Sequence, residues 1–556
     1  MNSIALTVPS EAMPLTSART KAGTLVISGV VFALTAALRF LALVRFTNDE
    51  YIGLAGAQQM LFGEWPTRDF VDPGLPLAYA VSAAAQVIFG RTLFAEAMLT
   101  SLAFGLAAAL TVVAARRLSG SLLVGAIAAV LEVAIFPRGY SYPKMLLYAA
   151  APLVIWWFVK RPSLARMTAL AVFVQIAFLF RHDHGLFIGA GAAVAAALAG
   201  EGVRSSRVML RRVAWFGAIS LVVALPYLVY IGINGGVIHY FVQGLRFSAA
   251  EAAENGLVIP PYGAGEGVER NAEAFLFFFF YLLPVVAAVV LGFRWRRSAD
   301  ASTLTAVAPL IVIALFVNRG FLRDELSTRL ADAVVPFVLL SAWLFGQILT
   351  VSSARTRALL HAAAFVLLGV SAYAMTTVGN TVEELNRASV FGGLQRMPER
   401  FADRSADLHN RYNARQMPAG TARILVPFFQ YVDRCTAPGQ RILVPGFIPE
   451  VPVHAGRPFA GGRSTILPGY LDAPDERRPV LATVERQNVP FMVVTSRSKD
   501  AVWASYPELA GYIDSHFTPL VSYQIGEDLS LLVDVRVNRS TTPRGTDAET
   551  GWPCFK

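Results

Sequence analysis

Long apolar blocks follow one another through the first two thirds of the chain and constrain its fold more than any other feature. Their lengths are near the 17–25 residues that a helix needs to cross a bilayer. Because only helices and closed barrels satisfy every backbone group in lipid, such blocks predict a mostly α, polytopic membrane protein. The blocks lie at about 23–45, 74–90, 93–114, 121–136, 142–159, 166–180, 184–200, 213–233, 272–293, 302–318, 332–350 and 357–376.

No block of this kind follows residue 377, where charges, proline and glycine become common. We therefore expect a cytoplasmic tail at 1–22, a transmembrane domain at 23–377 and a water-soluble α/β domain at 378–556. The first block is long enough to remain in the membrane, so we expect no cleaved signal peptide.

The formal charge of +10 comes from basic clusters that stand between the apolar blocks. Short basic loops prefer the cytoplasm, so this charge indicates membrane topology and not nucleic-acid binding. If every block spanned, the clusters after the second block would all fall outside. If 74–90 lies on the outer leaflet instead, all six fall in the cytoplasm. The clusters are Arg19/Lys21, Arg116/Arg117, Lys160/Arg161/Arg166, Arg204/Arg207/Arg211/Arg212, Arg294/Arg296/Arg297 and Arg355/Arg357.

We accordingly predict about eleven spans in a bacterial inner membrane, with the N-terminus cytoplasmic and the C-terminal domain extracytoplasmic. The segment 74–90 is also a weak candidate span in itself, because it is short and opens with Asp72-Pro73-Gly74-Leu75-Pro76. The outer face then collects most of the remaining polar residues.

The first outer loop carries four acids: Asp49 and Glu50 next to the first span, and Asp69 and Asp72 further on. Carboxylates in an apolar setting suit deprotonation of a hydroxyl or coordination of a hard cation. A solvated loop with a helix cap is the alternative.

Cations occupy two other outer loops, with Arg138 and Lys144 in the first and Arg319, Arg323 and Arg329 in the second. Arginine and lysine at headgroup depth are suited to binding a lipid phosphate. Tyr142 in the first of these loops is a candidate for the substrate site, as are Asp69, Asp72, Arg181, His182 and Asp183. Simple anchoring to the membrane is the alternative for the cations and for Tyr142.

The turn Arg181-His182-Asp183-His184 combines two histidines with an aspartate. A metal site is one interpretation, but residues two apart share a face only in an extended turn. We favour a polar turn with Arg181 paired to Asp183, close to a substrate site.

The C-terminal domain alternates predicted strands at 441–445, 490–495, 519–524 and 529–536 with helices at 475–487 and 502–514, which indicates a small three-layer sheet. It has no glycine-rich nucleotide motif. Cys435 and Cys554 are the two cysteines, and an oxidising compartment favours a disulfide between them.

The ordered motifs resemble the GT-C superfamily of membrane glycosyltransferases, in the bacterial branch related to protein O-mannosyltransferases and lipid A aminoarabinose transferases. The matching pieces are Asp49-Glu50-Tyr51, Gly63–Phe70, Pro73–Pro76, Phe89-Gly90, Ala115–Gly120, Phe180–Gly185 and, more weakly, Val453-His454-Ala455-Gly456-Arg457-Pro458.

This resemblance implies Asp49 as the catalytic base, with Glu50 supporting it or a metal. Many members carry a second acidic motif in the next outer loop, but 136–144 holds no Asp or Glu here. That difference fits metal-independent members, so we expect no metal and no cofactor.

We therefore predict an inverting glycosyltransferase that moves a sugar from a polyprenyl-phosphate donor to a lipid, glycan or protein acceptor. A polysaccharide polymerase or ligase using lipid-linked oligosaccharide is the alternative. A lipid-linked sugar transporter and a catalytically inactive binding relative are less favoured.

Overall fold

The computed structural model describes residues 18–43, 45–200, 205–255, 259–322, 326–387, 389, 392–412, 421–526 and 531–556. These residues form two compact units, each made of segments that are not consecutive in sequence. The bundle unit comprises the chain up to Ala42, Thr100–Pro226 and Asn255–Gly392. The mixed unit comprises Leu43–Leu99, Tyr227–Glu254 and Gly393–Lys556.

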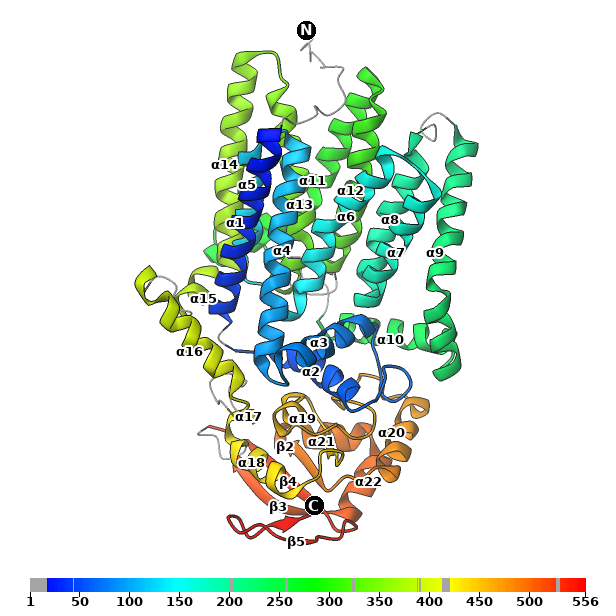
Figure 1. Ribbon diagram of the computed structural model, residues 1–556, viewed down its shortest axis with the longest axis vertical. Helices are drawn as coiled ribbons and strands as arrows, with labels where there is room; N and C mark the ends of the chain where they lie inside the picture. The colour runs from blue at the N-terminus through cyan, green and yellow to red at the C-terminus, as the bar shows by residue number, and fades with distance from the viewer. Residues whose placement is uncertain are drawn as a thin grey trace. The chain divides into compact units, whose positions relative to one another are not determined.

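Long helices run side by side through the bundle unit (Figure 1). Each of the eleven predicted spans has a helical counterpart among the described residues. They are α1 (Ala18–Ala42), α4 (Leu93–Ser119), α5 (Leu122–Val133), α6 (Tyr142–Lys160), α7 (Leu164–Phe180), α8 (His182–Leu198), α9 (Ser206–Asn234), α11 (Val268–Ser298), α12 (Ala301–Asn318), α13 (Leu326–Leu349) and α14 (Ala354–Val378).

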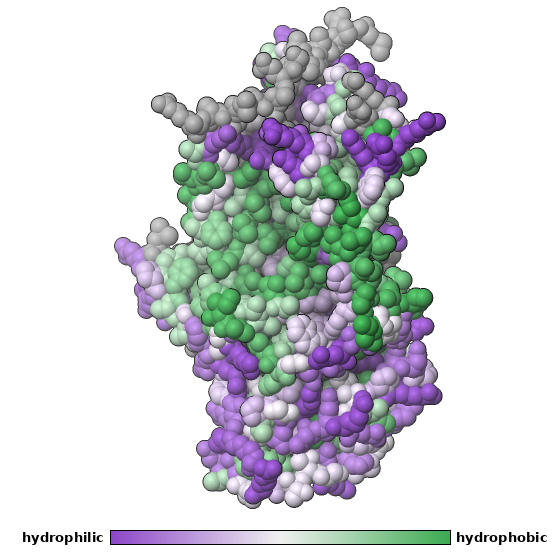
Figure 2. Space-filling model, turned by 45° about the vertical axis from the view of Figure 1, so that its right-hand side comes forward, coloured by the Kyte–Doolittle hydropathy of each residue, from purple (hydrophilic) through white to green (hydrophobic). Residues whose placement is uncertain are grey.

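Eight of the helices in the described part of the chain are long and apolar enough to cross a membrane, whereas α5, α7 and the helix Pro76–Phe89 are shorter apolar helices. Large apolar side chains such as Leu34, Val222 and Phe365 are exposed on the bundle. Apolar residues dominate the bundle surface seen in Figure 2. A surface of this kind is suited to lipid, which confirms the predicted polytopic helical class.

Glycines allow the helices of the bundle to approach closely. A Cβ at Gly105 would lie 2.8 Å from the carbonyl oxygen of Phe32, and one at Gly125 would lie 2.7 Å from that of Val112. Small residues at helix contacts are the usual means of packing in membrane proteins. These contacts fix α4 against both α1 and α5.

Helices α1 and α4 run antiparallel, as shown by the contacts of Arg116 with Thr24 and of Gly105 with Phe32. The C-terminal end of α1 and the N-terminal end of α4, which the segment 43–99 connects, therefore point in the same direction. The predicted non-spanning segment 74–90 is helix α3 (Pro76–Phe89), which belongs to the mixed unit. This arrangement is compatible with the eleven-span topology; which side each end faces stays a prediction.

The mixed unit contains α2 (Asn48–Leu61), α3 and α10 (Val237–Asn255) together with a small α/β fold. Its four-stranded sheet has the order β1-β2-β4-β3. The strands are β1 (Ile442–Leu443), β2 (Phe491–Thr495), β3 (Phe517–Gln524) and β4 (Leu532–Asn538). β1 and β2 are parallel, whereas β4 is antiparallel to both β2 and β3.

Side chains of β2 alternate between two apolar cores, as the period of a strand requires. Phe491 and Val493 pack with α18 (Val426–Cys435) and α19 (Glu450–Ala455), whereas Met492 and Val494 pack with helices of the opposite layer. That layer contains α20 (Pro474–Arg486), α21 (Ser496–Ser505) and α22 (Pro507–His516). The predicted three-layer sheet is therefore observed.

Two details differ from the sequence expectations. The helix predicted at 502–514 is two helices, because Pro507 cannot continue α21 and instead starts α22. The predicted domains were consecutive, whereas the mixed unit also takes in 43–99 and 227–254. The proposed boundaries at 22 and 377 concern membrane insertion and stay predictions; of the predicted tail, 1–17 lies outside the described residues.

The predicted disulfide is present and joins Cys435, at the end of α18, to Cys554, in the short strand β6 (Pro553–Cys554). The Phe555 backbone N–H also donates to the Cys435 carbonyl oxygen at 2.7 Å. The end of the chain is thereby fastened to the α18 face of the sheet.

Candidate functional site

A buried ion pair joins Lys144 of α6 to Asp332 of α13 inside the bundle unit. Lys144 Nζ lies 2.7 Å from Asp332 Oδ1, and the two side chains are 3% and 6% exposed. Arg329 extends the pair, with its guanidinium 3.8 Å from Asp332 Oδ2. Charges in apolar helices are expensive, and those that persist usually mark a functional site.

Local sequence explains why these side chains meet. Pro143 stands in the first turn of α6, where proline favours the start of a helix. Lys144 therefore also lies in the first turn, at the N-terminal end of α6. Arg329 and Asp332 are three apart on α13 and therefore share one face. Pro336 lacks an N–H, which leaves the Asp332 carbonyl without its usual helical donor.

The Arg181–Asp183 turn at the start of α8 adds a second ion pair to the bundle. Arg181 Nε donates to Asp183 Oδ1 at 2.9 Å, as predicted from the sequence. Asp183 Oδ1 also accepts from the backbone N–H of His184 at 2.8 Å, within the first turn of α8. The predicted polar turn is therefore observed.

His184 connects the two ion pairs. Its Nε2 lies 3.8 Å from Asp183 and 3.9 Å from Asp332, and its Nδ1 is hydrogen-bonded to the hydroxyl of Tyr148. The histidine is buried, and its Nε2 has no hydrogen bond within the described part of the chain. A buried polar atom of this kind is a place where a bound ligand or water gains a partner.

The bundle cluster, defined as Lys144, Arg181, Asp183, His184, Arg329 and Asp332, holds three cationic side chains and two carboxylates. It therefore carries one net positive charge while His184 is neutral. Cationic side chains in this setting suit an anionic ligand.

Not every predicted residue joins the cluster. Arg138 precedes the short helix η1 (Gly139–Ser141) and is exposed, and Arg319 is exposed at the start of η3 (Arg319–Leu322). Arg323 lies outside the described residues. Tyr142 packs edge-on against Phe180, and His182 stacks on Phe178.

Asp49 and Glu50 occupy the first turn of α2 in the mixed unit, and they differ in environment. The Glu50 carboxylate accepts a hydrogen bond from the backbone N–H of Thr47, three residues earlier. This is the carboxylate half of a capping box, so the burial of Glu50 has a structural explanation. Asp49 is half-buried.

The other two acids of the predicted site hold loops. Asp69 accepts hydrogen bonds from the Trp65 backbone N–H at 2.7 Å and from Arg68 at 2.8 Å. Asp72 is buried, and its Oδ1 accepts from the N–H groups of Gly74 and Leu75 at 2.9 and 2.7 Å.

Helix α10 reaches the same loop. Tyr240 of α10 donates to Asp72 Oδ2 at 2.9 Å and accepts from Tyr227 at 2.8 Å. Burial raises the pKa of Asp72 even though these donors favour its charged form. Asp72 thus stabilises a turn, and both of its carboxylate oxygens already accept hydrogen bonds from protein donors.

Metal-ligating side chains converge at one place among the described residues, where Cys435 and Cys554 approach Asp547. Both sulfurs belong to the disulfide, so this group offers one carboxylate only. The proposed absence of a metal at the transfer site stays a prediction.

Sequence reasoning overlooked Asp332, His184 as a cluster member, and Tyr148. Asp332 had a detectable signal, since it is an acid at the first position of an apolar block, three residues after Arg329. Tyr148 and His184 lie on different helices and meet only in the folded protein, so no local sequence pattern predicts their contact.

Fold and site together define a polytopic membrane protein with a buried ionic cluster among its helices. No protein-family model matches the sequence, and no curated protein matches it. Among solved structures, the chain is similar to ArnT from Cupriavidus metallidurans bound to undecaprenyl phosphate. The identity is 13% and the TM-score 0.48, over 94% of this chain and 98% of that one.

Proposed function

We propose that the protein is an inverting glycosyltransferase of a bacterial inner membrane, which uses a sugar linked to polyprenyl phosphate as donor. The observation that carries the proposal is the bundle cluster, with Lys144 and Arg329 buried around Asp332. The acceptor is a lipid, glycan or protein, and the reaction uses no divalent metal.

The charge of the donor suits this cluster. A polyprenyl-phosphate sugar carries one negative charge as a phosphodiester, whereas the departing polyprenyl phosphate gains a second. Fixed cations that bind the leaving phosphate more strongly than the donor lower the barrier, because catalysis depends on this difference. Asp332 holds the cations in place before the donor binds, so less reorganisation is needed.

The proposed reaction is a single displacement. The Asp49 carboxylate takes the proton from the acceptor hydroxyl, and the acceptor oxygen forms a bond to the anomeric carbon of the sugar. The bond between that carbon and the phosphate oxygen breaks, and its electron pair leaves with polyprenyl phosphate. Attack from the opposite face inverts the anomeric configuration.

Lipid binding to the purified protein in nanodiscs tests the donor site. Undecaprenyl phosphate, the lipid held in the ArnT crystal structure, is the probe, and native mass spectrometry counts the bound lipid. We expect Lys144→Met and Arg329→Gln to weaken retention by about tenfold each, since one hydrogen bond to a charged group contributes about 1.5–3 kcal/mol.

Arg296→Gln is the matched control, because Arg296 is an exposed arginine at the end of α11. It should retain lipid like the wild type. Equal retention by the Lys144, Arg329 and Arg296 variants would remove the phosphate-binding role of the cluster. Activity that is lost in EDTA and restored by Mg²⁺ or Mn²⁺ would contradict the metal-independent reaction.

A further inference from the structure

The helix that carries Asp49 presents a polar face to the C-terminal part of the mixed unit. Tyr51, Ala55, Gln58 and Gln59 recur at the spacing of one helical face, and all four are buried. Buried glutamines are unfavourable unless their amides are satisfied. The partners of these residues on the C-terminal segment therefore show what α2 is built to contact.

The two glutamines bind backbone groups of the segment 452–459. Gln58 Nε2 donates to the carbonyl oxygens of Pro452 at 2.9 Å and Arg457 at 2.8 Å. Gln59 pairs with Phe459 in both directions, donating to its carbonyl at 3.3 Å and accepting from its N–H at 3.2 Å. A two-way pair of this kind fixes both the rotation and the axial position of the helix.

Tyr51 provides a third contact, nearer to Asp49. Its hydroxyl lies 2.8 Å from His454 Nε2, and His454 Nδ1 lies 2.9 Å from the carbonyl oxygen of Arg411. A carbonyl can only accept, so Nδ1 carries the proton and Nε2 accepts from Tyr51. Burial lowers the pKa of His454 to about 4, which keeps this arrangement neutral near pH 7.

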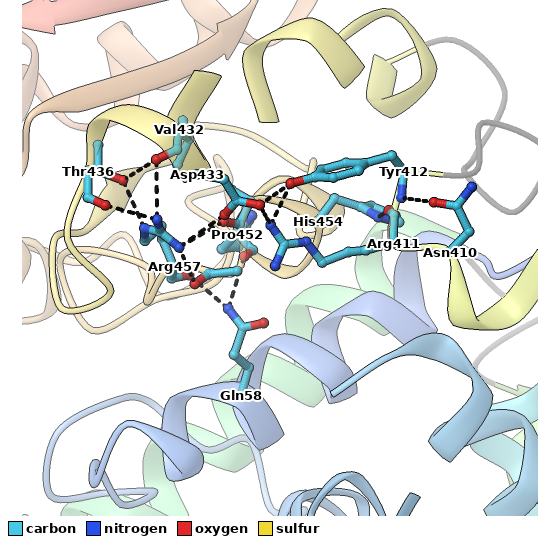
Figure 3. A network of polar contacts seen from close by, with 12 residues as sticks. Gln58, Asn410, Arg411, Tyr412, Val432, Asp433, Thr436, Pro452, His454 and Arg457 are labelled. Atoms are coloured by element: carbon cyan, nitrogen blue, oxygen red, sulfur yellow. Dashed lines mark hydrogen bonds and ion pairs between the residues drawn. The ribbon is translucent and has the colours of Figure 1, made fainter. Parts of the chain in front are cut away.

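A hydrogen-bonded hub holds the segment that receives these contacts (Figure 3). The buried Arg457 donates to the carbonyl oxygens of Val432 and Thr436 at 3.2 and 3.0 Å and to the Thr436 hydroxyl at 2.8 Å. Asp433 receives Arg411 and Tyr412 and lies 3.4 Å from Arg457. The hub fastens the segment to the end of α18.

Gly456 allows the chain to turn between these partners. Its φ of +61° is a left-handed conformation that favours glycine, and a Cβ there would lie 2.8 Å from the Arg411 guanidinium. The sequence motif Val453–Pro458 is thus explained, since His454, Gly456 and Arg457 each build the surface that α2 contacts.

We propose that the segment 452–459 is a positioning platform for the Asp49 helix, with Gln58, Gln59 and Tyr51 as the positioning residues. This inference rests on the proposed role of Asp49 as base. A base must stand within hydrogen-bonding reach of the acceptor, and a displacement of about 1 Å can reduce the rate by 10²-fold. If α2 is no longer held in place by the segment 452–459, turnover should fall while donor binding stays unchanged.

Steady-state kinetics of the full-length protein in nanodiscs tests the platform. The variants are Gln58→Met, Gln59→Met and their combination, with Tyr51→Phe as a smaller change that keeps the ring. We expect the double variant to lose about 10–10²-fold in kcat, with the donor KM unchanged. Gln86→Met, at a buried glutamine of α3, is the matched control and should retain kcat.

Hydrogen–deuterium exchange of the same samples separates positioning from folding. Exchange in peptides covering α2 should increase in the double variant, while exchange in β2 and β4 stays at the wild-type level. Wild-type kcat in folded double variant and Tyr51→Phe overturns the proposal, as does a loss that appears equally in donor KM. If the double variant fails to fold, Tyr51→Phe decides alone.

Asp49→Asn distinguishes failure of the positioning platform from failure of the proposed function. An inactive Asp49→Asn together with fully active glutamine variants removes the platform and retains the proposed function. Wild-type turnover in Asp49→Asn removes the proposed function and with it the catalytic meaning of the platform.

Discussion

Lys144 and Asp332 form an ion pair in the interior of the helical bundle, at 2.7 Å, although they lie on helices far apart in the sequence. Desolvating two such charges is costly, and a pair of apolar residues of similar volume often stabilises a protein as well or better. Stability alone therefore does not explain the pair, and its role in binding is the proposal that the next variants test.

Stability and activity should separate at this pair. Lys144→Met leaves Asp332 with Arg329 as a more distant partner, and a broken buried pair costs up to about 3–5 kcal/mol. The double variant Lys144→Met/Asp332→Leu removes both charges, so we expect it to regain thermal stability in detergent but not transferase activity. Recovery of activity in the double variant would show that the two charges only neutralise each other and have no role in the reaction.

The adjacent acids Asp49 and Glu50 should respond differently to amidation. Asp49→Asn keeps the shape and removes the proposed base, so turnover should fall by about 10²–10⁴-fold with little change in the melting temperature. Glu50→Gln keeps a weaker acceptor for the Thr47 N–H and should alter stability by about 1 kcal/mol. Kinetics and thermal unfolding of both variants check this contrast, and equal kinetic losses would contradict it.

Glu450, in the first turn of α19, should make stability depend on pH. Burial raises the pKa of its carboxyl from 4.5 to about 7, so the folded state holds the proton more tightly than the unfolded state. Stability from this group is full below about pH 4.5 and is lost as pH rises through 7.

Glu450→Gln should remove that loss, which amounts to about 3 kcal/mol at about 1.4 kcal/mol per pKa unit. Thermal unfolding at pH 5 and pH 8 is the measurement, with Glu549→Gln at an exposed acid as control. A wild-type protein whose melting temperature does not differ from that of Glu450→Gln across this range would contradict the prediction.

The disulfide should stabilise the mixed unit by constraining its unfolded chain. Cys554→Ser is expected to cost about 2–4 kcal/mol, because Cys435 and Cys554 are separated by 119 positions in the sequence. Labelling with a thiol reagent under denaturing, non-reducing conditions should modify neither cysteine in the wild type. Modification of both would show that the bond is absent from the isolated protein.

The sequence predicts the elements that follow from periodicity and length. Apolar blocks located the helices of the bundle, and alternating strands located the sheet on which Phe491 and Met492 face opposite cores. Asp332 was overlooked because one acid does not disturb the mean hydropathy of a block. The contact of Tyr51 with His454 depends on tertiary structure, and no spacing between them predicts it.

The structural role of Glu50, unlike the contact of Tyr51 with His454, could be predicted from the sequence. The pattern Thr47-Asn48-Asp49-Glu50 before an apolar run is a capping-box signature, so its structural role is readable from sequence. The resemblance to a catalytic acidic pair suggested a chemical role instead. The structure shows the Glu50 carboxylate bonded to the backbone, so the structural role is observed, whereas the role of Asp49 as base stays a proposal.

Reporter fusions provide the test of membrane topology. Whereas the 12-residue α5 belongs to the bundle unit, the 14-residue α3 belongs to the mixed unit. Its exposed Val87 and Ile88 suit a helix lying at the interface. Fusions after Arg117 and after Arg212 should therefore both report the cytoplasm, whereas a fusion after Lys556 should report the outside. A fusion after Arg117 that reports the outside would show that α3 crosses, and it would place the six basic clusters on different sides of the membrane.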